Sequence, residues 1–213
     1  MPLVSTPMLD AVPVRQQTHP PSDASVLEDV VLNDPDGNAV RLGDLWVERP
    51  AVLVFLRHFG CVFCRQLAVD IHNHRHEFAE ADVELAMIGF GPPEHAREFL
   101  QKQNVDLRLL LDPDRKVYEL AGAKVATLKE VIGPLQIWRG LVATIGSRIR
   151  QGSIAVNQGV IRTHAAQLGG ALVIAPDGSV RYAYLSEQSG DNPRAQEVLA
   201  AARAIRPHLN SGS

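Results

Sequence analysis

The two cysteines of this 213-residue chain, Cys61 and Cys64, are separated by only two residues and are the side chains most able to do chemistry. They follow an apolar run, residues 51–56, that is bounded by Pro50 and Gly60. This run predicts a buried strand, and the helical period after Gly60 predicts a helix. Thiols at such a junction lie near the unpaired amides and the dipole of a helix N-terminus, which favour the thiolate that attacks disulfides and peroxides.

The spacing of the pair also suits a reversible disulfide. Residues three apart share a helix face, so Cys61 at the cap and Cys64 in the first turn can reach disulfide geometry with little backbone movement. We expect Cys61 to be the more exposed nucleophile. Cys64 lies one step from a buried stripe through Ala68 and Ile71, and it would act as the resolving thiol.

Three cationic side chains near the pair, Arg57, His58 and Arg65, are candidates to stabilise a thiolate. If the strand continued through Arg57 and His58, its alternation would turn only one of the two inward. Arg65 lies just inside the predicted helix, where an arginine is usually solvated.

A metal site and a pair of unreactive thiols are the alternatives to redox chemistry. His72, His74 and His76 follow the cysteines closely, in a pattern superficially similar to a zinc finger. On one continuous helix, however, Cys64 and His72 would be separated by roughly 12 Å along the axis, whereas zinc ligands converge to about 2.0–2.3 Å from one ion. Four ligands cannot meet in this way, but His72 and His76 alone, on one helix face, could hold a metal.

Composition excludes several other classes of function. The net charge is -3 with both signs interspersed, so there is no basic field for nucleic acid and no polybasic segment for anionic lipid. The first 25 residues contain no apolar segment long enough for a signal peptide, and no later stretch is long enough for a membrane helix. We therefore expect a cytoplasmic protein, a compartment in which a lone Cys-x-x-Cys is more often reactive or metal-binding than a structural staple.

The remaining pattern predicts one α/β domain, residues 26–207, with an N-terminal arm (1–25) and a C-terminal tail (208–213). A mixed central β-sheet with helices on both faces fits this alternation. The predicted strands are 83–89, 107–111, 170–174 and 180–185, added to 51–56 and to an N-terminal hairpin over 26–42. The predicted helices run from residue 61 to about 80, from 92 through at least Leu100, from 112 to about 121, and over 193–205.

Residues 123–166 interrupt the alternation and are interpreted as a partly helical insertion before the C-terminal hairpin. Forty-odd residues would make a poor independent core. Long insertions beside reactive sites often act as lids or substrate walls. We expect its apolar residues to form a wall near Cys61; these are Ile137, Trp138, Leu141 and Ile145.

Two segments carry a resemblance to a known family: residues 59–65, Phe-Gly-Cys-Val-Phe-Cys-Arg, and residues 168–178, Leu-Gly-Gly followed by a strand and Pro-Asp-Gly. Together they resemble the peroxiredoxin-like branch of the alkyl hydroperoxide reductase and thiol-specific antioxidant group, within the thioredoxin-fold superfamily. The resemblance runs from about Val26 to Ala204. It implies a thioredoxin-like fold and a thiol-dependent redox enzyme that attacks with Cys61, resolves with Cys64 and needs no bound cofactor.

The resemblance also implies partners and a substrate wall. An external thiol system would reduce the enzyme, and a peroxide or a disulfide would oxidise it. Phe63, Leu168 and Gly169, with Trp138 from the insertion, would line the substrate. A homodimer is one assembly that the sequence leaves open.

This chain departs from the better-known members of the superfamily around the pair. Peroxiredoxins place a proline and a threonine or serine upstream of the attacking cysteine, where this chain has Arg57 and His58, and Gly169 stands where they commonly carry an arginine. The buried acid and the tryptophan of thioredoxins correspond to Phe55 and Gly60. Reduction of protein disulfides, reduction of an organic endoperoxide or thiol metabolite, and a non-catalytic metal- or partner-binding module therefore stay open beside peroxide reduction.

Overall fold

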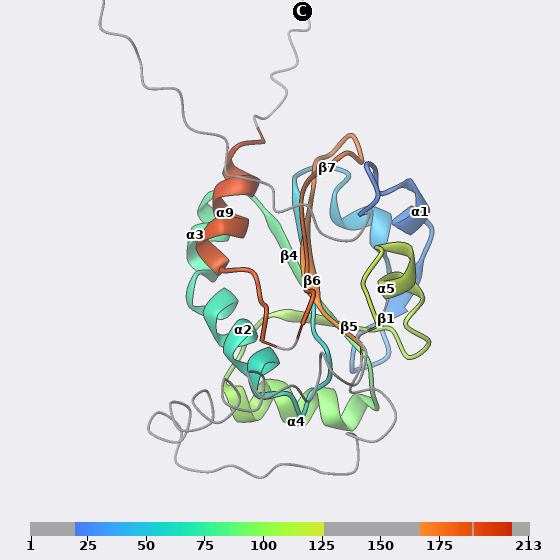
Figure 1. Ribbon diagram of the computed structural model, residues 1–213, viewed down its shortest axis with the longest axis vertical. Coiled ribbons are helices and arrows are strands. Elements are labelled where there is room, and N and C mark those ends of the chain that lie inside the picture. Colours follow the sequence, from blue (N-terminus) through green and yellow to red (C-terminus); the bar gives the residue numbers. More distant parts are fainter. Residues whose placement is uncertain (1–19, 126–166, 189, 206–213) are drawn as a thin grey trace, which may run out of the picture.

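The computed structural model describes residues 20–125, 167–188 and 190–205 (Figure 1). Before the central sheet lie α1 (Ser25–Glu28), β1 (Val31–Asn33), β2 (Ala39–Arg41) and the 3-10 helix η1 (Leu42–Leu45). The central part comprises β3 (Ala51–Phe55), α2 (Val62–Asn73), α3 (Arg75–Glu80), β4 (Glu84–Gly89), α4 (Pro93–Gln103), β5 (Arg108–Leu111) and α5 (Lys116–Leu120). The chain closes with β6 (Gly170–Ile174), β7 (Val180–Leu185) and α9 (Ala195–Arg203).

The strands form one seven-stranded mixed sheet in the order β2-β1-β5-β4-β3-β6-β7. β3, β4 and β5 are parallel, as expected for strands joined by helical crossovers, whereas β6 pairs antiparallel with both β3 and β7. β3 occupies an interior position and every residue of it is buried, which explains its uninterrupted apolar sequence. The predicted mixed α/β architecture is confirmed.

Helices cover both faces of the sheet. In Figure 1, α2, α3 and α9 lie on one side, and α1 and α5 lie on the other. Alternate residues of β3 separate the two apolar layers: Val52 and Val54 pack in the core with α2 and α9, and Leu53 and Phe55 pack with α1 and α5. The C-terminal end of β3 therefore lies between two well-packed cores, at the point where the cysteines follow.

The N-terminal region differs from its prediction. Residues 26–28, predicted as strand, belong to α1, and the hairpin is limited to β1 and β2. Its turn is held by the Asp34 carboxylate, which accepts the amides of Asp36 and Asn38. The last residues of the predicted arm pair with the late hairpin, since Ala24 donates its amide to the carbonyl of Gly178.

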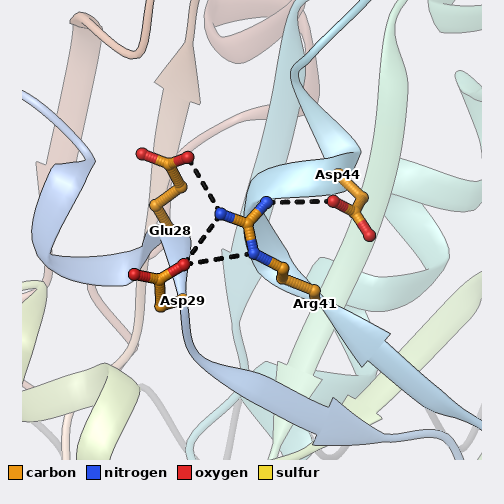
Figure 2. A network of polar contacts seen from close by, with 4 residues as sticks. All are labelled: Glu28, Asp29, Arg41 and Asp44. Atoms are coloured by element: carbon orange, nitrogen blue, oxygen red, sulfur yellow. Dashed lines mark hydrogen bonds and ion pairs between the residues drawn. The ribbon is translucent and has the colours of Figure 1, made fainter.

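Arg41 connects α1, β2 and η1. Its guanidinium contacts the carboxylates of Glu28, Asp29 and Asp44, as Figure 2 shows. The three carboxylates are largely solvent-exposed, so these ion pairs contribute little to the stability of the fold.

The helix predicted from residue 61 to about 80 is two helices. α2 ends at Asn73, and His74, with φ -97° and ψ 5°, links it to α3. The apolar positions still face the same core, because Leu67 and Ile71 of α2 and Phe78 of α3 share one cluster. Periodicity therefore located the buried face but not the break.

Two further predictions concern boundaries. α5 begins at Lys116 instead of 112, because the buried Asp112 carboxylate accepts the amides of Lys116 and Val117 from outside the helix. The predicted insertion, 123–166, lies outside the described residues except for its first three. No helix in the described ranges has the length and apolar character needed to cross a membrane.

Candidate active site

The cysteines lie where the sequence pattern placed them, at the junction of β3 and α2. β3 ends at Phe55, and Cys61 is the N-cap of α2, with extended backbone angles of φ -75° and ψ 124°. The first helical hydrogen bond runs from the Arg65 amide to the Cys61 carbonyl, 3.1 Å away. The predicted strand-thiol-helix arrangement is confirmed.

Both thiols are free and nearly enclosed. Cys61 is 7% exposed and Cys64 is 1% exposed. The order agrees with the expectation that Cys61 is the more accessible of the two.

Arg57 contacts both sulfurs, each with a different part of the residue. Its backbone amide donates to Cys64 Sγ at 3.1 Å, and its guanidinium Nη1 lies 3.8 Å from Cys61 Sγ. The same guanidinium donates from Nε to the carbonyl of Gln167 at 3.2 Å. Arg57 thus directs its positive charge to Cys61 from a fixed position.

This environment separates the ionisation of the two thiols. The pKa of Cys61 is lowered well below its ordinary value by a hydrogen bond from the Cys64 thiol, with further help from the charges of Arg57 and His58. Burial opposes that shift. The pKa of Cys64 is raised, first because the thiol is buried and second because it donates to Cys61. One thiolate, at Cys61, is therefore the favoured ionised state of the pair.

Strand alternation does not decide which of Arg57 and His58 faces inward, because β3 has already ended at Phe55. Both side chains are buried, at 5% and 7% exposure. The expectation that only one faces inward was wrong, since it assumed that the strand continued. Arg65 is also more than a solvated cation: it donates to the carbonyl of Gly60 at 3.2 Å and holds the loop before Cys61.

Phe63 and Leu168 take up different positions among the predicted wall residues. Phe63 is partly buried, and its carbonyl accepts a hydrogen bond from the side chain of Asn192 at 2.9 Å. Its ring lies against Gly190, where an added Cβ would come within 2.9 Å of the ring. Leu168 is fully buried.

Gly169 passes the end of β3 at very close range. A Cβ at Gly169 would lie 2.2 Å from the carbonyl oxygen of Phe55, so only glycine fits. Trp138 and the other apolar residues of the predicted insertion wall lie outside the described residues.

Four residues that sequence reasoning did not single out also shape the site: Tyr118, Gln167, Gly190 and Asn192. The Tyr118 hydroxyl contacts the carbonyls of Leu56 and Ile88 and so fixes the strand end before Arg57. In the sequence Tyr118 stood out only as an apolar position of a predicted helix, and the other three residues belong to loops without periodicity. Their contacts join segments that are distant in the sequence, so no local pattern marks them.

The two-histidine version of the metal site finds no support in the described residues. His72 lies in α2 and His76 lies in α3, on either side of the break at His74. Nδ1 of His72 instead accepts the amide of Asp106 at 3.2 Å. Within the described part of the chain, no group of three or more His, Cys, Asp or Glu side chains is arranged to hold a metal ion.

A mixed sheet covered on both faces, with two thiols at the start of the helix that follows an interior strand, defines a thioredoxin-fold thiol oxidoreductase. Residues 70–188, more than half of the chain, match the AhpC/TSA antioxidant enzyme family. The chain belongs to this family and is a peroxiredoxin-like enzyme. The matched range begins after Cys64, so it leaves the roles of the two cysteines to be argued from the site.

Similar proteins agree with this assignment. The chain is 29% identical to a peroxiredoxin-like 2C of Bos taurus, covering 88% of this chain and 82% of that protein. It is 30% identical to a prostamide/prostaglandin F synthase of Xenopus tropicalis, covering 76% of this chain and 78% of the relative. The crystal structure of the peroxidoxin BcpB from Mycobacterium tuberculosis shares the fold, with a TM-score of 0.61, 23% identity, and coverage of 90% of this chain and all of that one.

Proposed function

We propose that this enzyme reduces peroxides with the Cys61-x-x-Cys64 dithiol, in which Cys61 attacks and Cys64 resolves. The observation that carries the proposal is the position of Arg57, whose guanidinium lies 3.8 Å from Cys61 Sγ while its amide donates to Cys64 Sγ. A cation beside a thiolate stabilises the ionised nucleophile. The different pKa directions of the two thiols support the same division of roles.

The proposed reaction moves two electrons from the dithiol to the peroxide. The Cys61 thiolate attacks one oxygen of a hydroperoxide, the O–O bond breaks, and the leaving alkoxide or hydroxide takes up a proton. Cys61 is then a sulfenic acid. The Cys64 thiol attacks its sulfur, releases water and closes the disulfide. An external dithiol, or two molecules of a monothiol, then reduces the disulfide and regenerates both cysteines.

The dithiol supplies both electrons, so this reaction needs no bound cofactor. The proposed partners are a thiol reductant and a peroxide, as the family membership favours. A cytoplasmic location belongs to the proposal, because that compartment provides thiol reductants and keeps the resting pair reduced.

A second substrate, an organic endoperoxide, is favoured by the 30% identical prostamide/prostaglandin F synthase relative. The pair belongs to an apolar cluster with Phe59 and Leu67, and Phe63 packs against it, which suits an organic substrate better than hydrogen peroxide. Here Cys61 would attack one peroxide oxygen and form a sulfenate ester while the other oxygen leaves as an alkoxide. Attack by Cys64 would release the second alcohol, so that the products are a diol and the same disulfide.

Turnover by the reduced enzyme with dithiothreitol tests the proposal, using hydrogen peroxide, an organic hydroperoxide, a cyclic organic endoperoxide and a protein disulfide in parallel. We expect Cys61→Ser to abolish turnover with every substrate that the wild type reduces. Unchanged activity in Cys61→Ser, or turnover only with the protein disulfide, would contradict peroxide reduction.

Mass spectrometry of Cys64→Ser distinguishes the two peroxide classes. A hydroperoxide should leave a Cys61 sulfenic acid that dimedone captures. An endoperoxide should leave the whole substrate joined to Cys61 instead, because both of its oxygens carry carbon. If neither the hydroperoxide nor the endoperoxide modified Cys61, the sulfur of Cys61 would not be the attacking atom.

A further inference from the structure

Gln167 is a buried polar residue at the point where the chain returns to the sheet after the segment that begins at Val125. Val125 and Gln167 form an isolated antiparallel bridge, and Leu168 donates its amide to the carbonyl of Lys124 at 2.9 Å. Gln167 is only 3% exposed. A buried amide side chain is unfavourable unless it makes hydrogen bonds, so its partners define its role.

The side chain of Gln167 ties together the backbone around it. Its Nε2 lies 3.2 Å from the carbonyl of Leu168, 3.3 Å from that of Lys124 and 3.5 Å from that of Ala123. These contacts crosslink the chain on both sides of the bridge. They hold the backbone of Gln167, including its own carbonyl, in one position.

That carbonyl accepts the Nε–H of Arg57 at 3.2 Å, and the same guanidinium reaches Cys61 Sγ with Nη1. The guanidinium is a rigid planar fork, so fixing Nε also fixes the direction of Nη1. The close passage of Gly169 past Phe55 brings this segment within reach, since a Cβ there would also lie 3.6 Å from Cγ of Arg57.

We propose that Gln167 is a positioning residue for the thiol chemistry, which holds the Arg57 guanidinium against Cys61 by locking its own carbonyl in place. The inference rests on the proposed role of Cys61 as the nucleophile. Within the described part of the chain Gln167 has no hydrogen bond to either sulfur, and it acts through Arg57. Gln167 orients the positive charge of Arg57 and does not supply it.

A double-mutant cycle in the Cys64→Ser background tests this inference through the pH dependence of Cys61 alkylation by iodoacetamide. Gln167→Leu keeps the volume but removes the donor, and we expect it to raise the pKa of Cys61 by about one unit, which is roughly a tenfold loss of thiolate below that pKa. With Arg57→Leu already present, Gln167→Leu should have no further effect. Gln101→Leu, on the exposed face of α4, is the matched control and should change nothing.

An unchanged pKa of Cys61 in folded Gln167→Leu, or an equal shift with and without Arg57, would overturn the proposal. The second outcome would mean that Gln167 only loosens the structure. If Gln167→Leu fails to fold, Gln167→Met, which has a similar length and no N–H donor, takes its place in the cycle. Arg57→Lys adds a second measurement, because lysine keeps the charge but has no Nε–H for the Gln167 carbonyl. We expect Arg57→Lys to raise the pKa of Cys61, and a wild-type value would refute the positioning role.

Alkylation does not require turnover, so the cycle is independent of the proposed function. A wild type without peroxidase activity but with the predicted coupling would reject the proposed reaction and leave the role of Gln167 intact. A wild type with peroxidase activity but without this coupling would keep the proposed reaction and reject the role of Gln167.

Discussion

The guanidinium of Arg57 lies 3.8 Å from the sulfur of Cys61, and the backbone amide of the same residue donates a hydrogen bond to the sulfur of Cys64. Arg57 therefore places a positive charge beside one thiol and a neutral donor beside the other. Cys61 lies beside a guanidinium that is held by the Gln167 carbonyl and favours the thiolate, whereas Cys64 receives neutral backbone donors in a fully buried position. The predictions below follow from this asymmetry and from the contacts that maintain it.

The first prediction concerns the hydrogen bond from Cys64 to Cys61, the largest cause of the lowered Cys61 pKa. Cys64→Ser keeps a hydroxyl donor, and Cys64→Ala removes it. We expect the pKa of Cys61 to be higher in Cys64→Ala than in Cys64→Ser, as measured by the pH dependence of alkylation. Equal values in the two variants would show that the side-chain donor at position 64 does not lower the pKa of Cys61.

The second prediction is a dependence of stability on pH. Cys61 has a folded pKa below the ordinary 9.0, so between that pKa and 9.0 the unfolded chain binds more protons at Cys61 than the folded one. Its contribution therefore grows as pH rises, is complete above 9.0, and is lost as pH falls through the folded pKa. Cys64 has a raised folded pKa, so its contribution declines as pH rises above 9.0.

Urea unfolding of the reduced protein at a series of pH values measures both effects. The free energy of unfolding should rise with pH up to about 9 and level off or fall beyond it. Cys61→Ser should lack the rise. A wild type and a Cys61→Ser variant with parallel pH profiles would contradict the lowered pKa.

The third prediction concerns the close passage of Gly169 past Phe55. Gly169→Ala places a Cβ 2.2 Å from the Phe55 carbonyl oxygen, so the backbone must move. We expect a loss of roughly 1–3 kcal/mol in the free energy of unfolding, as for overpacked core positions, together with slower Cys61 alkylation at neutral pH.

Gly37→Ala is the control for Gly169→Ala. Gly37 has a φ of +91° and open space around it, so alanine there is strained without touching the site. It should lower stability and leave Cys61 alkylation unchanged. If both variants changed alkylation equally, the effect would come from general destabilisation.

The fourth prediction is that Tyr118→Phe destabilises the fold. Its hydroxyl contacts the carbonyls of Leu56 and Ile88 in a fully buried position. Removing it should lower the free energy of unfolding by about 1–3 kcal/mol, the penalty for a buried polar group left without its partner. Burial raises the pKa of Tyr118 well above the usual value, so this loss should be constant from neutral to mildly alkaline pH.

Tyr182→Phe, on β7, is the matched control because its hydroxyl takes no part in the Leu56 contact. Burial raises the pKa of Tyr182 to about 12. Denaturant unfolding of both variants gives the comparison. A Tyr118→Phe variant as stable as the wild type would mean that the Leu56 carbonyl finds another donor.

The placement of the two thiols after a buried strand could be predicted from the sequence, because it depends only on neighbouring residues. An uninterrupted apolar run favours a strand buried on both faces, and a Cys-x-x-Cys between such a run and a helical pattern is placed at the start of the helix, as β3 and Cys61 are. The break at His74 could not be predicted, because the apolar positions on both sides of it face one core and keep a helical period.

The support of the thiols depends on contacts between distant segments. Gln167 lies 110 residues from Arg57 in sequence, and no periodicity connects them. The burial of both Arg57 and His58 was missed for a related reason: the end of β3 depends on its pairing with β4 and β6, which a single strand does not reveal. The position of the cysteines at the start of a helix could therefore be predicted from the sequence, while the contacts around them required the fold.

The measurement that tests the central claim most directly is the rate of alkylation of each cysteine in the reduced wild type as a function of pH, resolved by peptide mass spectrometry. The account predicts that Cys61 is alkylated with an apparent pKa well below the ordinary 9.0, and that Cys64 stays unmodified until well above it. Equal rates at the two cysteines, or a more reactive Cys64, would contradict the assignment of Cys61 as the thiolate nucleophile.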